Sequence, residues 1–172
     1  MADPIRVLLV DDSAFVRQAV LRMLTSLPGV EVVASVSNGA DGIALARTLR
    51  PDVIVLDVNL PDRDGLDVLA TIMEEAPTGV LMLSTLTRED ADITMRALEL
   101  GAVDFVDKAS AGTAMDIHRL EPVIQEKVLM VAGAALPRDR IEGTVPTPLQ
   151  PIPAGYRPAS QERVRSPYDR VV

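Results

Sequence analysis

The sequence predicts an α/β fold in which a doubly wound parallel sheet of five strands is covered by helices on both faces. Short, nearly continuous apolar runs alternate five times with longer segments of helical periodicity. Continuous apolar runs are typical of parallel strands that are buried on both faces. Residues that commonly end strands or begin helices stand at most of the changes from run to segment. Strands that alternate with helices form a parallel sheet with helices on both sides, so this is the fold class we expect.

The five predicted strands are short and rich in Val, Leu and Ile. The first, Ile5–Val10, is a near-continuous apolar run that is followed at once by two aspartates. The third, Val53–Asp57, ends on an aspartate and leads into a loop that contains Pro61. In chain order, the predicted strands are residues 5–10, 30–36, 53–57, 80–84 and 102–106.

The predicted helices carry apolar residues three or four positions apart, together with start and stop signals. Ser13 is suited to cap the first helix, and residues 87–90 (TRED) are close to a capping box for the fourth. Pro51 ends the second helix, because a helix rarely includes the residue before proline. Gly101 is suited to the C-cap of the fourth helix. In chain order, the predicted helices are residues 14–27, 39–49, 66–76, 87–100 and 122–131.

The composition changes near residue 133, which predicts a compact domain over residues 1–132 and a Pro-rich linker over residues 133–172. Residues 1–130 carry 11 basic and 21 acidic side chains, whereas residues 131–172 carry 6 and 4. Seven of the 13 prolines lie from Pro137 onward. Such a composition favours an extended, poorly packed segment.

The composition also argues against several classes of protein. A net charge of −8 disfavours non-specific nucleic-acid binding, which depends on a basic surface. No apolar segment of about 18 residues is present, so membrane insertion is not expected. The absence of cysteine excludes disulfides and thiolate metal sites, and it fits a cytoplasmic protein.

Polar residues are expected to gather at the carboxyl edge of this sheet. Asp11 and Asp12 follow the first strand, Asp57 ends the third, Ser84 ends the fourth and Lys108 follows the fifth. Ligands of open α/β sheets bind at this edge, where neighbouring strands lie about 4.8 Å apart. Three carboxylates this close force one of them to hold a proton unless a cation neutralises them. An all-oxygen site of this kind suits Mg²⁺.

These residues together predict transfer of a phosphoryl group to Asp57. The Asp57 carboxylate would be the nucleophile. The compact charge of Lys108 suits one phosphate oxygen, and the Ser84 hydroxyl can donate to another. Each residue alone has a simpler explanation, as a helix cap, a solvated turn or a surface side chain. Their occurrence in the right order at the ends of four strands favours a site.

Four stretches resemble a known family: RVLLVDDSAFVRQ, DVIVLDVNLPDRDGLDVL, VLMLSTLT and RALELGAVDFVDK. They are similar to the receiver domain of bacterial two-component response regulators over about residues 4–132. Among receivers, VDDSAFVR, LSTLT, ALELGAVDFVDK and DIHRLEPVIQEKV look most like that of the chemotaxis protein-glutamate methylesterase. The resemblance implies a flavodoxin-like fold with strand order 2-1-3-4-5.

The resemblance implies that Asp57 is phosphorylated by a histidine kinase. It also implies that Mg²⁺ is held by Asp12, Asp57 and the backbone carbonyl of Asn59, and that Asp11 reaches the ion through water. Lys108 would pair with the phosphoryl group.

The resemblance further implies a switch, in which Ser84 moves toward the phosphoryl group and the rotamer of Phe105 follows. The output face would be the fourth helix, fifth strand and fifth helix. Two positions differ from the family pattern. Phe105 lacks the hydroxyl of a tyrosine. Ala109 follows Lys108 where the family commonly has proline after a cis bond, which is costly before alanine.

In the methylesterase family, a receiver and linker precede a hydrolase domain, and Arg170-Val171-Val172 resembles the first residues of such a domain. This chain has no serine elbow and His118 is its only histidine, so we expect no esterase activity of its own. His118 is expected at the surface before the last helix. The chain would control a methylesterase domain in cis, and chemoreceptors indirectly.

Two other interpretations remain open from the sequence. One is a stand-alone receiver that relays phosphate or acts as a phosphate sink. The other is a small phosphohydrolase with Asp57 as nucleophile, although such enzymes usually carry a second acid where this chain has Asn59. A receiver that only binds partners is disfavoured, because every phosphorylation residue is present.

Overall fold

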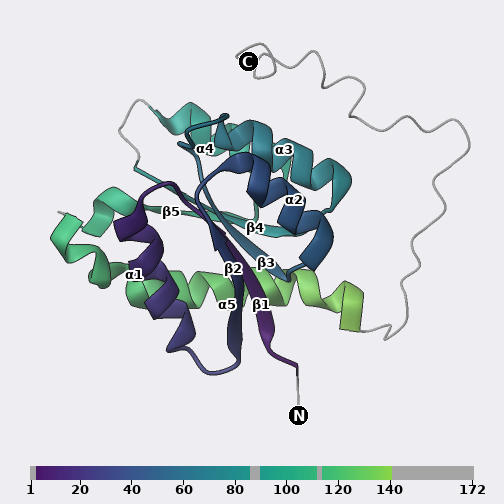
Figure 1. Ribbon diagram of the computed structural model, residues 1–172, viewed down its shortest axis with the longest axis horizontal. Coiled ribbons are helices and arrows are strands. Elements are labelled where there is room, and N and C mark those ends of the chain that lie inside the picture. The colour runs from purple at the N-terminus through teal and green to yellow at the C-terminus, as the bar shows by residue number, and fades with distance from the viewer. Residues whose placement is uncertain (1–2, 86–89, 112–113, 141–172) are drawn as a thin grey trace, which may run out of the picture.

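The computed structural model describes residues 3–85, 90–111 and 114–140. These residues form a five-stranded parallel sheet with the order β2-β1-β3-β4-β5, which is the order that the resemblance implied (Figure 1). The strands are β1 (Ile5–Val10), β2 (Val30–Val36), β3 (Val53–Asp57), β4 (Gly79–Ser84) and β5 (Asp104–Asp107).

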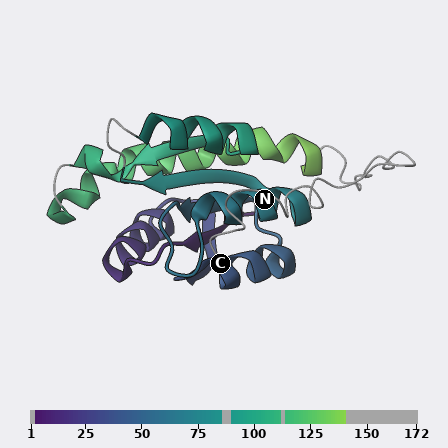
Figure 2. The same ribbon diagram turned by 90° about the horizontal axis from the view of Figure 1, so that it is seen from above.

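Five α-helices alternate with the strands, as the sequence predicted. Two 3₁₀ helices between β5 and the last α-helix were not predicted. Figure 2 shows the strand arrows pointing toward the end of the molecule at which these 3₁₀ helices lie. The helices are α1 (Ala14–Thr25), α2 (Gly39–Leu49), α3 (Gly65–Glu75), α4 (Ala91–Leu100), η2 (Lys108–Ala111), η3 (Ala114–Leu120) and α5 (Glu121–Arg140).

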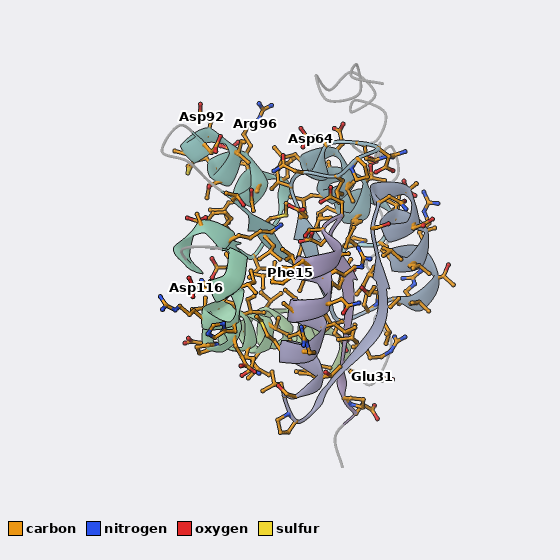
Figure 3. All side chains as sticks on the ribbon, turned by 60° about the vertical axis from the view of Figure 1, so that its left-hand side comes forward. Phe15, Glu31, Asp64, Asp92, Arg96 and Asp116 are labelled. Atoms are coloured by element: carbon orange, nitrogen blue, oxygen red, sulfur yellow. The ribbon has the colours of Figure 1, made fainter. Side chains whose placement is uncertain are left out.

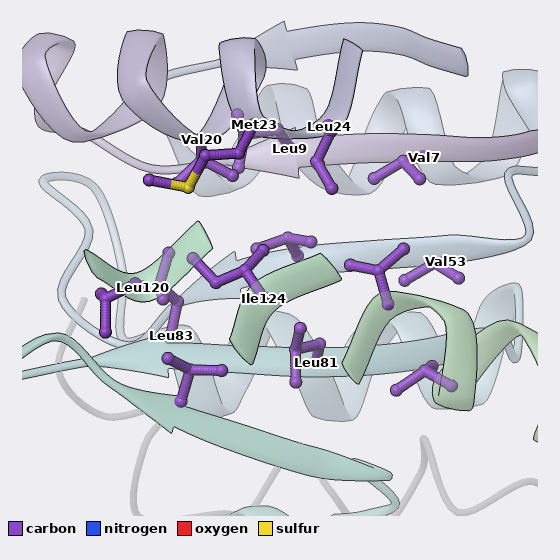
Figure 4. Close-up of a cluster of buried hydrophobic side chains, with 14 of the residues drawn as sticks. Val7, Leu9, Val20, Met23, Leu24, Val53, Leu81, Leu83, Leu120 and Ile124 are labelled. Carbon is purple, nitrogen blue, oxygen red and sulfur yellow. The ribbon is translucent and has the colours of Figure 1, made fainter. Parts of the chain in front are cut away.

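Each face of the sheet packs against its own set of helices. Alternate residues of a strand point to opposite faces, so Leu9 contributes to the cluster under α1 and α5, and Leu8 to the cluster under α2, α3 and α4. Every residue of β3 and β4 is buried. The α1–α5 cluster is drawn in Figure 4, where its labelled members include Val7, Leu9, Val20, Met23, Leu24, Val53, Leu81, Leu83, Leu120 and Ile124.

Several predicted ends differ from the observed ones. β5 begins at Asp104 and not at residue 102, because the Ala102 N–H still donates to Ala97 O of α4 at 3.0 Å. α1 ends at Thr25, and Leu27 N–H donates instead to Leu24 O in a tighter turn. The predicted capping box lies mostly within residues 86–89, outside the described residues, and α4 begins at Ala91.

The last helix is longer than predicted. α5 begins at Glu121, close to the predicted start at residue 122, and continues to Arg140. Residues 133–140 therefore belong to a helix, although their composition predicted the start of a linker. The remaining predicted linker, residues 141–172, lies outside the described residues. The division into a domain and a linker stays a prediction.

Candidate functional site

The strand register brings the predicted site residues to one level of the sheet. Val10 pairs with Leu56, so Asp11 follows beside Asp57. Ser84 pairs with Asp107, so Lys108 follows at the same edge. The Asp11 N–H donates to Val36 O at 3.1 Å and so extends the sheet contacts of β1 by one residue.

Three carboxylates and one ammonium group meet at this edge. Asp11, Asp12 and Asp57 each offer an oxygen atom, and these oxygens all lie within 4.8 Å of one another. Lys108 Nζ lies 3.0 Å from Asp11 Oδ2 and 3.2 Å from Asp57 Oδ2. Asp11, Asp57 and Ser84 are buried, with 0%, 2% and 2% of their surface exposed, whereas Asp12 is exposed. The site therefore has two buried acids, a buried hydroxyl and one side open to solvent.

The single positive charge of Lys108 does not fully neutralise the two buried carboxylates, Asp11 and Asp57. Burial and, next, the neighbouring Asp11 carboxylate raise the pKa of Asp57, and the net value is about 6. The Lys108 charge and the Asn59 N–H, which donates to Asp57 Oδ1 at 3.2 Å, lower this pKa but do not cancel the effect. The site thus favours binding of an additional positive charge, either a proton or a cation.

The residues present fit a divalent cation with oxygen ligands. Asp11 Oδ2 is buried and accepts no hydrogen bond. Its 3.0 Å contact with Lys108 Nζ is an ion pair without hydrogen-bond geometry. A buried carboxylate oxygen with spare lone pairs, beside two further carboxylates, is the ligand type that Mg²⁺ prefers. Asn59, the fourth predicted ligand, follows Asp57 by two residues in the β3–α3 loop.

Backbone contacts fix the loop that carries Asp11. The Ser13 N–H donates to Asp11 Oδ1 at 2.9 Å, and the Ser13 hydroxyl oxygen accepts from the Val16 N–H as the predicted cap of α1. Arg17 Nη1 donates to the Asp11 carbonyl at 2.8 Å. Sequence reasoning did not identify Arg17. The only feature of the sequence that could have indicated this role is the position of Arg17, one helical turn after the cap residue Ser13.

Lys108 reaches the site without a proline after it. The described residues contain no cis peptide bond. The Ala109 N–H, which a proline would lack, donates to Asp107 Oδ1 at 2.8 Å. This Asx-type turn begins η2 at Lys108 and directs the chain away from β5. Sequence reasoning did not identify the role of Asp107.

The loop after β3 is held close to the strand by a glycine. The Gly65 N–H donates to Val58 O at 2.7 Å, and a Cβ at Gly65 would lie against Asp57 O and 2.7 Å from Val58 O. Only glycine fits this approach, so the end of β3 and the start of α3 are fixed together. Asp64 caps α3 by accepting from the Leu66 N–H at 2.8 Å (Figure 3).

Phe105 and His118, two further residues that the sequence analysis singled out, lie away from the acidic cluster. Phe105 is partly buried and packs against the cluster under α2, α3 and α4. His118 is exposed in η3, directly before α5, as expected. Among the described residues, no helix has the length and hydropathy needed to span a membrane.

The strand order and this acidic edge define the class: a flavodoxin-like α/β protein with a cluster of carboxylates at its switch point. Residues 7–118 match the response regulator receiver domain, and the chain belongs to that family. This confirms the resemblance found in the sequence.

The curated relatives of this chain include several protein-glutamate methylesterases/protein-glutamine glutaminases. The protein-glutamate methylesterase/protein-glutamine glutaminase 1 of Oleidesulfovibrio alaskensis is 44% identical over 94% of this chain and 42% of its own length. The homologous enzyme of Archaeoglobus fulgidus is 49% identical over 76% of this chain and 37% of its own length. The chain therefore spans less than half of these relatives.

Solved structures agree with the fold. The response regulator domain of Thermotoga maritima CheB has a TM-score of 0.71 and 39% identity, covering 76% of this chain and 97% of that domain. A CheX–CheY–BeF₃–Mg²⁺ complex from Borrelia burgdorferi contains a chain with a TM-score of 0.61 and 26% identity, covering 78% of this chain and 90% of its own.

Proposed function

We propose that Asp57 accepts a phosphoryl group from a chemotaxis histidine kinase and that the resulting aspartyl phosphate switches the output surface of the receiver. The observation that carries this proposal is the buried Asp57 carboxylate, which ends β3 beside two more acids and lies 3.2 Å from Lys108 Nζ. A buried carboxylate at the carboxyl edge of a parallel sheet is suited to act as a nucleophile on a ligand bound there.

The reaction needs positioning and charge neutralisation more than proton transfer. An Asp57 oxygen attacks phosphorus, an O–P bond forms, and the bond from phosphorus to the donor's leaving group breaks. The Lys108 ammonium lies close enough to Asp57 Oδ2 to stay near the transferred oxygens. The buried Ser84 hydroxyl, at the end of the next strand, is suited to donate to one of them.

Mg²⁺ is the cofactor that this mechanism requires. The proposed direct ligands are Asp12, Asp57 and the Asn59 backbone carbonyl, and Asp11 is proposed to reach the ion through water. When bound, the ion neutralises the acids and the incoming phosphoryl oxygens. The clustering of the three carboxylates and the spare lone pairs of Asp11 Oδ2 support this ligand set. The presence of Mg²⁺ in the similar CheX–CheY complex supports it as well.

The output we propose is control of a methylesterase domain in cis and, through it, of chemoreceptors. The relatives are more than twice as long as the aligned region, and this chain aligns with 42% of one of them. Phosphorylation would favour an inward Ser84 arrangement in a pre-existing equilibrium. Phe105, partly buried beside β4, would follow this movement. The cytoplasmic location expected from the sequence stays a prediction.

Intact mass after treatment with a small acyl phosphate and Mg²⁺ tests the acceptor. Wild type should gain the mass of one phosphoryl group, and Asp57→Asn should gain none. Asp92→Asn makes the same chemical change at an exposed position of α4 and should behave as wild type (Figure 3). A gain of equal size in Asp57→Asn would rule out Asp57 as the acceptor.

A further inference from the structure

The loop after β3 is tied to a helix that lies outside the acidic site. Asp62 Oδ1 accepts from the Gly39 N–H at 2.7 Å, and Asp62 Oδ2 accepts from the Ala40 N–H at 2.9 Å. Both amides belong to the first turn of α2. One carboxylate therefore uses both of its oxygens to satisfy two of the N–H groups that a helix N-terminus leaves without intrahelical partners.

The cap of α2 is divided between two side chains. Asn38, the local N-cap, accepts from the Asp41 N–H at 2.8 Å. Asp62 accepts from the two preceding amides, which lie 22 and 23 residues before it in the chain. Burial pushes the pKa of Asp62 upward, but the Gly39 and Ala40 amides outweigh burial, and the net effect is a lowered pKa. The carboxylate form is thus the one that the helix binds.

The position of Asp62 links this cap to the acidic site. The β3–α3 loop leaves the sheet at Asp57, passes through Asn59 and Asp62, and returns at Gly65. Its two ends are fixed to each other, since Asn59 forms a bridge with Asp64 and the Gly65 N–H donates to Val58 O. The outer part of the loop is held separately, by the hydrogen bonds that the Asp62 carboxylate accepts from the first amides of α2.

Packing keeps that anchor close. A Cβ at Gly39 would lie 2.8 Å from Arg63 Cγ and 2.7 Å from Val68 Cγ2. The absence of a side chain at Gly39 therefore lets the stem of Arg63, the residue next to Asp62, lie against the start of α2. A larger residue at position 39 would force the two apart.

We propose that Asp62 is a positioning residue for the cation site: its two hydrogen bonds to α2 hold the loop so that Asn59 presents its backbone carbonyl to Mg²⁺. This inference rests on the proposed function, because it takes Asn59 as a ligand. A loop fixed before the ion arrives loses less conformational entropy on binding, so the ion binds more tightly. By linkage, bound Mg²⁺ should in turn strengthen the contact between Asp62 and α2.

Magnesium titration of the full chain by calorimetry tests the role, with three variants. Asp62→Ala removes both acceptors, and Asp62→Asn keeps one acceptor oxygen and protects the fold. Asn38→Ala is the matched control, because it removes the other half of the same helix cap without touching the loop. The readout is the Mg²⁺ dissociation constant, with the thermal midpoint of each variant measured alongside.

The expected result is a split between affinity and stability. Asp62→Ala should weaken Mg²⁺ binding about tenfold, the lower end of the range for residues that support metal ligands. Asp62→Asn should weaken it less, and Asn38→Ala should leave it unchanged, although both alanine variants lower the thermal midpoint. In wild type, Mg²⁺ should also slow hydrogen exchange of the Gly39 and Ala40 amides.

Two results would overturn the inference. One is an unchanged dissociation constant in Asp62→Ala. The other is equal weakening by Asn38→Ala, which would assign the effect to the integrity of α2 alone. Either result leaves the proposed function intact as long as wild type takes up a phosphoryl group. A wild-type chain that neither binds Mg²⁺ nor takes up phosphoryl would instead reject the proposed function.

Discussion

At the scale of single residues, Asp57 is buried, which disfavours its charged form, yet it has to be ionised to act as a nucleophile. Its burial raises its pKa to about 6, from a usual value of 3.8. Between these pH values the folded state binds a proton that the unfolded state releases, so the stability contribution of Asp57 falls as pH rises through this window. Above about pH 6 the full cost of the buried charge is present. The group is nevertheless ionised at neutral pH, as a nucleophile must be.

Replacing this carboxylate should therefore stabilise the metal-free protein. In chelator at pH 7.5, Asp57→Asn should unfold with a free energy higher by on the order of 3 kcal/mol, because each pKa unit corresponds to about 1.4 kcal/mol. The difference should shrink as pH falls toward 4, where wild type becomes protonated. Denaturant unfolding at several pH values measures this. A variant less stable than wild type at pH 7.5 would contradict the pKa assigned to Asp57.

The two lysines of the chain permit a matched test of the cation at the site. Lys108 contacts two buried carboxylates, whereas Lys127 Nζ pairs with Asp104 Oδ2 at 2.6 Å, and both of those side chains are about 30% exposed. Lys108→Ala should slow phosphoryl uptake about 100-fold, the usual cost of removing one group that stabilises developing charge. Lys127→Ala should leave the rate unchanged, since exposed pairs contribute little. Rapid-quench mass measurements compare the rates of phosphoryl uptake of the two variants. Equal rates would show that Lys108 takes no part in the reaction.

At the scale of elements, the junction between β3 and α3 depends on a close backbone contact. A methyl group at Gly65 meets the carbonyl oxygens of Asp57 and Val58. Gly65→Ala should lower the unfolding free energy by about 1–3 kcal/mol, because the backbone has to shift, and it should also weaken Mg²⁺ binding. Gly133→Ala in α5, where nothing lies within 4 Å of the new Cβ, should raise stability by about 0.5–1 kcal/mol. Chemical denaturation checks both, and a neutral Gly65→Ala would contradict the contact.

The elements that the sequence predicted well are those whose signals are local. Ser13 caps α1 as its residue type suggested, and Gly101 ends α4 in a left-handed conformation. The start of β5 was misplaced because Ala102 bonds back to α4, a contact that apolar character does not reveal. The 3₁₀ helix η3 has no periodicity long enough to recognise in the sequence.

At the scale of the whole molecule, the site lies where two hydrophobic layers end together. β3 is buried on both faces by separate clusters, one under α1 and α5 and the other under α2, α3 and α4. Such close packing gives the strand end little freedom. Asp57 is thus held at the end of a fully buried strand, while the side chain of Asp12 is exposed to solvent.

The clustering of the acids at the sheet edge was predictable from the sequence, whereas the contacts that support these acids were not. Acids at strand ends follow from the alternation of strands and helices, since parallel strands share an edge, so Asp11 and Asp57 were predicted together. The contacts of Arg17 with Asp11 O and of Asp62 with Gly39 depend on where separate segments meet in space. Composition, spacing and periodicity do not predict such contacts between distant segments.

A chain that ends at residue 140 should keep both the fold and the chemistry. Among the residues whose burial the structure describes, the buried members of the two hydrophobic clusters lie between Val7 and Ala132, and the proposed site residues lie between Asp11 and Lys108. The shortened chain should therefore unfold at the same temperature as the full chain and take up phosphoryl at the same rate. Calorimetry and intact mass on the two chains, side by side, measure this. A slower uptake with an unchanged unfolding temperature would show that residues 141–172 act on the site, and a lower unfolding temperature would show that they contribute to the fold.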